Sequence, residues 1–528
     1  MPDMDIRVNG ASMQVPEGTS AAAALILSGG YSRRSVSGEA RTAFCGMGTC
    51  FECRCEINGE PHQRGCQVMC RPGMDIRADS GAAAPASIAP AIAMTHDETA
   101  AKLYFDVVVI GGGPAGIAAA SAASESGRSV ALVDDNPAAG GQIWRGETAK
   151  SSGSEAGRWL RRLRHSPVQV ISGARVFHWE NGRLGAEANG AYLEICYREL
   201  ILATGARERF LPFPGWTLRG VFGAGGLQAL LKAGLPVAGK RILVAGTGPL
   251  LLAVAAYARE HGAKVLAICE QAEWKNVARF AAATTRAPGK LKDALRFGWA
   301  LRGVPYWTSA WAAAAVGKER LESVRVLRNG RVRELGCDYL ACGFHLAPNL
   351  ELANFAGCST ENGFVAVDEF QRTPVAHIFC AGETTGIGGL EKSLVEGQIA
   401  GYAATGNEGA ARRLFAERDG CARFAAAMKS AFRLRQELKS LAQPETLLCR
   451  CEDVSIGRVG RFDSWRAAKL HTRCGMGPCQ GRVCGAAAEI LFGWKTDSVR
   501  PPVFAVECGS LAAVGSAGAS VASQSRRT

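Results

Sequence analysis

Long apolar runs are missing from this sequence of 528 residues. The most apolar stretch begins at Ile242, and glycines and a proline interrupt it, so it predicts a strand, a turn and a helix, and no membrane span. The first residues also lack the apolar segment of a secretory signal. We therefore expect a cytoplasmic protein without a transmembrane segment.

Aromatic residues are scarce, at 7%, and they do not alternate with the basic residues that give the chain its formal net charge of +13. The basic residues form scattered helix-like runs, such as 158–164. Single-stranded nucleic acids are bound by combining positive charge with stacked aromatic rings. We therefore expect no nucleic-acid partner, and a basic surface that faces solvent or another protein.

The sequence shows no Ser/His/Asp constellation and no paired carboxylates, so it indicates no general acid or base. It also lacks a C-x-x-C or C-x₄-C motif just after GGQIW (140–144), and a C-x-x-C in the region 215–335. This excludes a redox disulfide of the glutathione-reductase or thioredoxin-reductase kind. His345, in a turn, either faces a cofactor or is packed or solvated.

Cysteine, in contrast, is abundant, with 19 residues in two groups. Without an export signal such groups indicate metal or cluster ligands and not disulfides. Cys45, Cys50 and Cys53 have the C-x₄-C-x₂-C spacing of plant-type [2Fe–2S] ferredoxins, and glycines between them let backbone amides approach the cluster. Cys66, after a hairpin turn, is the expected fourth ligand, with Cys70 in reserve. Cys55 is expected to pack within a strand, and zinc is the competing metal.

The second group contains Cys449, Cys451, Cys474 and Cys479, spaced C-x-C…C-x₄-C. This spacing is similar to that of the small helical [2Fe–2S] domain related to bacterioferritin-associated ferredoxin (BFD). Cys484 is near enough to replace one ligand. A structural zinc site is again the alternative, because C-x-C pairs are common in such sites.

A glycine-rich turn follows an apolar strand that ends near residue 110. Three glycines form G-x-G-x-x-G at the start of an alanine-rich helix, and the next strand ends on an acid. Glycines let the backbone approach a pyrophosphate at a helix N-terminus, and the acid accepts a hydrogen bond from a ribose hydroxyl. The expected dinucleotide-binding residues are Gly111, Gly113, Pro114, Ala115, Gly116 and Asp134.

Three later stretches favour FAD as this dinucleotide. GGQIW (140–144), ILATGARER (201–209) and TPVAHIFCAGET (373–384) are similar, in this order, to segments of flavoproteins with two dinucleotide-binding domains. Glu383 stands where that class has aspartate, which keeps the carboxylate but shifts its reach by one methylene. These stretches add the expected FAD-binding residues Gly141, Gln142, Ala203, Thr204, Gly205, Gly382 and Glu383.

A second strand–turn–helix–strand unit begins near Lys240. Gly246 and Gly248 are present, but Leu251 replaces the third glycine, and Glu270 ends the second strand. The acid would favour NAD over NADP, while the leucine makes a close backbone approach harder. The occupant is therefore NAD, another adenine nucleotide, or none.

The alternation of strands and helices predicts an α/β fold. The expected parts are a ferredoxin-like domain (1–80), a linker (81–103), an FAD-binding domain (104–214 and 336–410), a second nucleotide-binding domain (215–335), a helical connector (411–446), a BFD-like domain (447–512) and a disordered tail (513–528).

The whole order of motifs resembles the α-subunit (A-subunit) of multi-subunit amine and amino-acid dehydrogenases and oxidases. This family includes opine oxidases, hydrogen cyanide synthase, hydroxyproline and proline dehydrogenases and sarcosine oxidase. LPFPGW (211–216) and CGFHLAPNLEL (342–352) add to the resemblance, which covers about residues 3–510. It implies a glutathione-reductase-like flavoprotein with two dinucleotide-binding domains, fused to an N-terminal ferredoxin and a C-terminal BFD-like domain.

The resemblance also implies a division of labour. An FAD-containing β-subunit, with a possible small third subunit, oxidises the amine, and this chain conducts the electrons through FAD and two [2Fe–2S] clusters to an acceptor such as a quinone. Such a complex could be peripheral at the inner membrane through its partners. The alternatives are a self-sufficient NADH-dependent ferredoxin-type reductase and a scaffold whose cofactors are structural.

Overall fold

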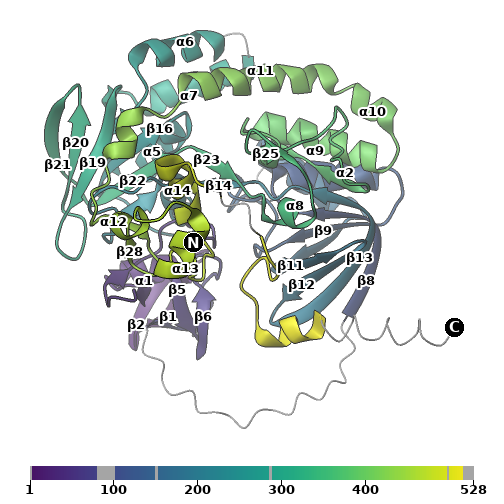
Figure 1. Ribbon diagram of the computed structural model, residues 1–528, viewed down its shortest axis with the longest axis horizontal. Coiled ribbons are helices and arrows are strands. Elements are labelled where there is room, and N and C mark those ends of the chain that lie inside the picture. Colours follow the sequence, from purple (N-terminus) through teal and green to yellow (C-terminus); the bar gives the residue numbers. More distant parts are fainter. Residues whose placement is uncertain (1–2, 80–100, 149–152, 285–287, 496–498, 515–528) are drawn as a thin grey trace. The chain divides into compact units, whose positions relative to one another are not determined.

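The computed structural model describes residues 3–79, 101–148, 153–284, 288–495 and 499–514 (Figure 1). The chain forms two compact units. The first comprises Met1–Ala84, Arg207–Ala347 and Ala426–Thr496, and the second comprises Pro85–Ala206, Pro348–Ala425 and Asp497–Thr528. Most of the predicted linker (81–103) and tail (513–528) lies outside the described residues.

An N-terminal five-stranded sheet in the first unit carries the first cysteine loop. Asn9 and Gly10 have φ of 50° and 84°, as a two-residue hairpin turn requires, and Ile6 and Val8 alternate into the core. Helix α1 (Ala21–Leu27) packs its buried alanines beneath the sheet. The strand order is β2 (Ala11–Pro16), β1 (Asp3–Val8), β7 (Asp75–Ala78), β5 (Arg54–Ile57) and β6 (Glu60–Arg64). The short strands β3 (Arg33–Arg34) and β4 (Ala40–Arg41) precede the cysteine loop at 45–53.

A parallel five-stranded sheet forms the second nucleotide-binding fold, in the same unit. Continuous apolar runs bury its central strands on both faces, as parallel sheets between helices require. The order is β15 (Val221–Gly223), β22 (Tyr339–Phe344), β16 (Arg241–Thr247), β17 (Lys264–Glu270) and β18 (Tyr306–Trp307). Its helices are α4 (Ala224–Lys232), α5 (Leu250–Glu260), α6 (Trp274–Thr284) and α7 (Pro288–Ala300). A separate antiparallel sheet contains β19 (Ala310–Val316), β20 (Ser323–Arg328) and β21 (Arg331–Gly336).

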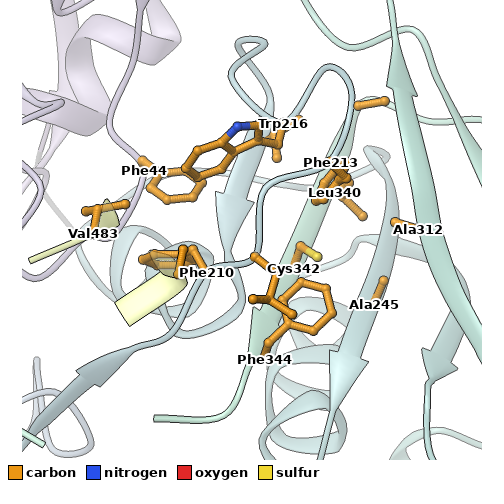
Figure 2. Close-up of a cluster of buried hydrophobic side chains, with 14 of the residues drawn as sticks. Phe44, Phe210, Phe213, Trp216, Ala245, Ala312, Leu340, Cys342, Phe344 and Val483 are labelled. Carbon is orange, nitrogen blue, oxygen red and sulfur yellow. The ribbon is translucent and has the colours of Figure 1, made fainter. Parts of the chain in front are cut away.

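The second cysteine group lies in a small, mainly helical region of the first unit. Its elements are β27 (Leu447–Cys449), β28 (Val454–Ser455), α12 (Ile456–Val459), α13 (Trp465–Thr472) and α14 (Cys484–Phe492). One hydrophobic core joins it to the ferredoxin loop and the nucleotide fold. In Figure 2, Phe44 of the ferredoxin lies beside Phe210 and Trp216, and Val483 comes from the cysteine region. The core thus draws on segments that are hundreds of residues apart.

The second unit is the first dinucleotide-binding fold. Parallel strands run in the order β10 (Gln169–Ser172), β9 (Val130–Asp134), β8 (Ala101–Ile110), β13 (Ala191–Leu202) and β26 (Ile378–Cys380), and β12 (Arg183–Ala188) and β11 (Ala174–Glu180) extend β13 in antiparallel fashion. Helix α2 (Pro114–Ser124) packs on α9 (Leu390–Ala404). Gly397 and Gly401 permit this approach, because a Cβ on either would lie within 2.3 Å of a carbonyl oxygen of α2.

Two boundaries differ from the sequence-based expectation. Strand β8 begins at Ala101, inside the expected linker, because its first residues pair with the long strand β13. Residues 499–512, expected in the C-terminal cysteine domain, belong to the second unit. Val503 N donates to the carbonyl oxygen of Phe177, and Glu507 N donates to Glu187. Among the residues described, no helix has the length and apolar character needed to cross a membrane.

Candidate redox cofactor sites

The first glycine-rich turn lies where a dinucleotide would meet a helix N-terminus. Gly111 has φ +107°, and a Cβ there would lie 2.2 Å from the carbonyl oxygen of Ala203. A Cβ on Gly116 would lie 1.7 Å from the carbonyl oxygen of Gly111. In contrast, a Cβ on Gly113 would meet no atom within 4 Å. The turn is therefore closed where it packs on the fold and open in front of α2, where a pyrophosphate would lie.

The predicted acid and the GGQ segment lie against this turn. The amide of Gly112 donates to Asp134 Oδ2, and the backbone and side-chain amides of Asn136 donate to Oδ1 at 2.6 and 2.7 Å. Burial, with the nearby Asp135, raises the pKa of Asp134 to about 6. A Cβ on Gly141 would lie 2.9 Å from Gly113 Cα. The sequence-predicted residues of this site are therefore close together.

The Ala-Gly-Glu turn after β26 offers a free carboxylate oxygen. Glu383 Oε1 accepts a hydrogen bond from Gly389 N at 2.8 Å, whereas Oε2 is buried and has no partner among the described residues. Burial raises the pKa of Glu383. A buried, unsatisfied acceptor is costly unless a ligand donates to it. The atom thus fits a hydroxyl of the FAD ribityl chain.

A buried ion pair, which the sequence analysis did not predict, is hydrogen-bonded to this turn. Lys392 Nζ lies 2.7 Å from Glu396 Oε2, which also accepts from Gly382 N at 3.0 Å and from Thr385 Oγ1 at 2.7 Å. Lysine and glutamate at i and i+4 on a helix are a sequence signal for such a pair. That spacing is also common on solvent-exposed helices, so it does not by itself indicate a site.

Replacing Gly113 by alanine is expected to remove bound FAD without unfolding the chain. Its φ of −74° suits alanine, and the new methyl group would enter the open space in front of α2. We expect FAD affinity to fall about tenfold or more, equivalent to about 1.4 kcal/mol. The measurement is FAD per chain after gel filtration, together with the thermal midpoint of the FAD-free protein. Gly409→Ala, at an exposed position of α10 (Glu408–Arg412) in the same unit with no atom within 4 Å of its Cβ, is the matched control. Unchanged FAD content in Gly113→Ala would contradict the assignment.

The second glycine turn has a similar backbone, but its acid, Glu270, is completely buried. A Cβ on Gly246 would lie 1.8 Å from the carbonyl oxygen of Gly343, while Gly248 faces open space. Leu251 is buried between helix α5 and the sheet. Glu270 has no exposed surface and accepts from Gly248 N, Thr247 Oγ1 and Ala272 N at 2.7–2.9 Å. Burial raises its pKa to about 7. In this conformation Glu270 offers no accessible oxygen to a ribose.

Residues 432–435 cover the end of the strand that carries this acid, through bonds to the residue after it and to Thr247. Gln271 Nε2 donates to the carbonyl oxygen of Arg433 at 3.2 Å, and Arg435 N donates to Gln271 Oε1 at 3.0 Å. His345, considered as a cofactor-facing residue, donates from Nε2 to the carbonyl oxygen of Phe432, and burial lowers its pKa. His345 is therefore a packed residue that holds the covering segment in place.

The first cysteine group forms a buried thiol cluster. The amides of Met47 and Cys50 donate to Cys45 Sγ at 3.4 Å, and Gly48 N donates to Cys66 Sγ at 3.2 Å. Hydrogen bonds from the Cys50 thiol and from these amides lower the pKa of Cys45 to about 6. Cys53 and Cys66 pack in one cluster, and the Cys66 thiol raises the pKa of Cys53. Backbone donors of this kind also stabilise the sulfurs of an iron–sulfur cluster.

The two reserve cysteines of this region have different surroundings. Cys55 lies on β5 and Cys70 lies in the core beneath β1, and burial raises the pKa of these thiols to about 12 and about 11. Both pack in the core of the N-terminal sheet, whereas Cys66 packs in the same cluster as Cys53. The geometry therefore favours Cys66 over Cys70 as the fourth ligand.

The second group brings together five cysteines. The sulfur atoms of Cys449, Cys474 and Cys484 all lie within 4.8 Å of one another, and Cys451 Sγ lies 3.4 Å from Cys479 Sγ. The close thiols of Cys451, Cys474 and Cys484 lower the pKa of Cys449 strongly. A [2Fe–2S] cluster needs four thiolates, so one thiol is in excess. Cys484, considered only as a substitute in the sequence, is as well placed as Cys474.

Comparisons with known proteins agree with this arrangement. Residues 105–404 match the pyridine nucleotide-disulphide oxidoreductase family, and residues 2–81 match the 2Fe-2S iron-sulfur cluster binding domain. The chain is 32% identical to the A subunit of opine oxidase from Rhizobium meliloti (strain 1021) over 454 residues, which cover 77% of this chain and 98% of that protein. It is 30% identical to the HcnB subunit of hydrogen cyanide synthase from Pseudomonas aeruginosa over 420 residues, 71% of this chain and 90% of the relative.

A solved structure, that of L-proline dehydrogenase from P. horikoshii, superposes with a TM-score of 0.67 over 97% of each chain, at 18% identity. At this identity the likeness concerns the fold, which confirms the predicted α/β class with two nucleotide-binding folds. The first family covers more than half of the chain, and it and the N-terminal domain imply FAD and a [2Fe–2S] cluster. The chain therefore belongs to the pyridine nucleotide-disulphide oxidoreductase family and, within it, to the group that contains the A subunit of opine oxidase and the HcnB subunit of hydrogen cyanide synthase.

Proposed function

We propose that this chain is the electron-transfer subunit of a heteromeric oxidase or dehydrogenase that acts on the CH–NH bond of an opine or amino acid. A partner subunit with its own FAD oxidises the substrate, and the electrons leave this chain for an acceptor such as a quinone. The observation that carries the proposal is the presence of two buried groups of cysteines in a chain that also has an FAD-binding fold.

The residues of the cofactor sites suit electron transfer better than catalysis of bond formation or cleavage. FAD can accept two electrons together and release them singly, and each [2Fe–2S] cluster carries one electron. Gly113, Asp134 and Glu383 would hold the FAD. The proposed cluster ligands are Cys45, Cys50, Cys53 and Cys66 at one site, and Cys449, Cys451 and Cys479 with Cys474 or Cys484 at the other. The chain's part is to bind these groups and exclude water from them, since all of these thiols are buried.

The surroundings of Glu270 disfavour the NADH-dependent reductase. An NADH site in the second nucleotide-binding fold would need open space beside the acid for the ribose. Residues 432–435 bond to Thr247 and Gln271 on either side of this position, and Leu251 fills the space of the third glycine. We therefore expect that NADH neither binds tightly nor reduces the FAD.

The test is to purify the full chain alone and together with its co-expressed partner subunit, and to mix each with opines, amino acids or NADH under anaerobic conditions. Bleaching of the FAD absorbance by an opine or amino acid only when the partner is present is the expected result. Rapid bleaching by NADH in the chain alone would support the reductase instead. Substrate oxidation by the chain alone would contradict the proposal.

A further inference from the structure

A buried ion pair links the two cysteine groups. Glu52 lies between Cys50 and Cys53, and Arg450 lies between Cys449 and Cys451. Arg450 Nη2 lies 3.4 Å from Glu52 Oε2, and the two side chains are 3% and 0% exposed. Glu52 is therefore within two residues of the proposed ligands of the first site. It contacts Arg450, which is adjacent to proposed ligands of the second site.

Arg33 strengthens the same connection. Its Nη2 lies 2.8 Å from Glu52 Oε1 and also donates to the carbonyl oxygen of Arg450 at 3.0 Å. Glu52 thus lies between two arginines, and the three side chains together carry one net positive charge. One cavity, moreover, is lined by Cys45 and Cys50 of the first cysteine group and by Arg482 and Val483. The latter two residues lie between Cys479 and Cys484 of the second group. The two sites are neighbours within one unit.

Aromatic rings hold Arg450 in position. Its guanidinium lies 4.2 Å from the ring centroid of Phe44 and 4.9 Å from that of Trp216. The centroids of these two rings are 5.5 Å apart, and Figure 2 shows them as neighbours. Arg450 Nη1 donates to the carbonyl oxygen of Trp216 at 2.8 Å, and Trp216 Nε1 donates to that of Leu447 at 2.8 Å. The charge therefore has a fixed place beside both sites.

Stability alone does not explain this arrangement. Burying ion pairs costs desolvation free energy, and well-packed apolar residues of similar volume are often at least as stabilising. We therefore look for a role of these buried charges in the electrostatics of the two cysteine sites. Reduction of a [2Fe–2S] site adds one electron, and hence one negative charge, close to the ion pair, where the low dielectric leaves charges poorly screened.

We propose that the Glu52–Arg450 ion pair is shared by the two iron–sulfur sites and that its charges bias the reduction equilibrium of both. This inference rests on the proposed function, because both cysteine groups must hold a cluster. The positive charge of Arg450 stabilises the added electron at either site, and the negative charge of Glu52 opposes it. Loss of Arg450 therefore disfavours reduction at both sites, and loss of the Glu52 charge favours it at both.

The experiment is EPR-monitored reduction of the full chain by dithionite, which supplies the electrons and is oxidised to sulfite. The two signals are assigned with variants that lack a ligand of one site. In Arg450→Met, the reduction equilibrium constant should fall about tenfold at both sites, which corresponds to about 59 mV for a one-electron couple. In Glu52→Gln it should rise at both sites, and Arg450→Lys, which keeps the charge, should restore most of the wild-type behaviour.

Arg54→Met is the matched control. Arg54 follows Cys53 directly, as Arg450 follows Cys449, but its guanidinium pairs at 3.3 Å with Asp79, which belongs to the N-terminal part of the chain. Its replacement should shift only the N-terminal site. If Arg450→Met does not fold, the isosteric Glu52→Gln still decides the question.

Two failures are distinguishable. Suppose that the wild-type chain holds about four irons and that, in both Arg450→Met and Glu52→Gln, the reduction equilibrium constant changes at one site only. This result overturns the inference that the ion pair acts on both sites, and it leaves the proposed function standing. Zinc, or iron at only one site, in the wild-type chain overturns the proposed function and this inference with it.

Discussion

Cys53→Ala is expected to lose two of about four irons per chain, together with the EPR signal of the N-terminal site. Cys53 packs beside Cys66 in the buried group that also contains Cys45 and Cys50. Three thiolates leave one coordination position of a [2Fe–2S] cluster unfilled, and the carboxylate of the loop, Glu52, is already paired with two arginines. Cys66→Ala should have the same effect. The measurement is iron, zinc and acid-labile sulfide per chain in anaerobically purified protein.

Cys55→Ala and Cys70→Ala are the controls for this prediction. Both thiols are buried in the same domain, but they pack in the core of its sheet, apart from the cluster that contains Cys53 and Cys66. Both variants should keep all of the iron and lose only packing stability. Retention of the full EPR signal in Cys66→Ala, with its loss in Cys70→Ala, would show that the fourth ligand is Cys70.

The parts of the fold that depend on local signals could be predicted from the sequence. The strand, glycine turn and helix at 105–124 follow one another directly, and the Asn9-Gly10 hairpin is encoded by two residues. The spacing of Cys45, Cys50 and Cys53 is likewise local. In each case the residues that define the feature lie within one or two turns of the chain, so tertiary context has little to add.

The features that the sequence did not reveal depend on contacts between distant segments. Nothing near Glu270 indicates that residues 432–435 will cover the end of its strand, and nothing near residue 500 indicates that this segment leaves the cysteine domain to pack on β11. The Glu52–Arg450 pair joins residues that are 398 positions apart. Charged residues between cysteines are ordinarily expected to face solvent, so only the fold identifies this pair as buried.

The second large effect is expected at Cys449. The Cys449 sulfur lies within 4.8 Å of those of Cys474 and Cys484, and the nearby Cys451 thiol lowers its pKa, so Cys449 interacts with both parts of the C-terminal group. Cys449→Ala should lose both irons of this site and its EPR signal, while the N-terminal signal stays. The N-terminal site should survive because its thiols and amide donors come from residues 45–66 alone.

The excess thiol gives this prediction a sharper form. A [2Fe–2S] cluster takes four ligands, and Cys474 and Cys484 both lie beside Cys449, so one of the two is dispensable. One of the single variants Cys474→Ala and Cys484→Ala should keep the iron, and the double variant should lose it. Cys358→Ala, a buried thiol of the other unit, controls for the loss of a buried sulfur. A site that holds one zinc ion in place of two irons, without acid-labile sulfide, would mean that these thiols have a structural role and carry no electrons.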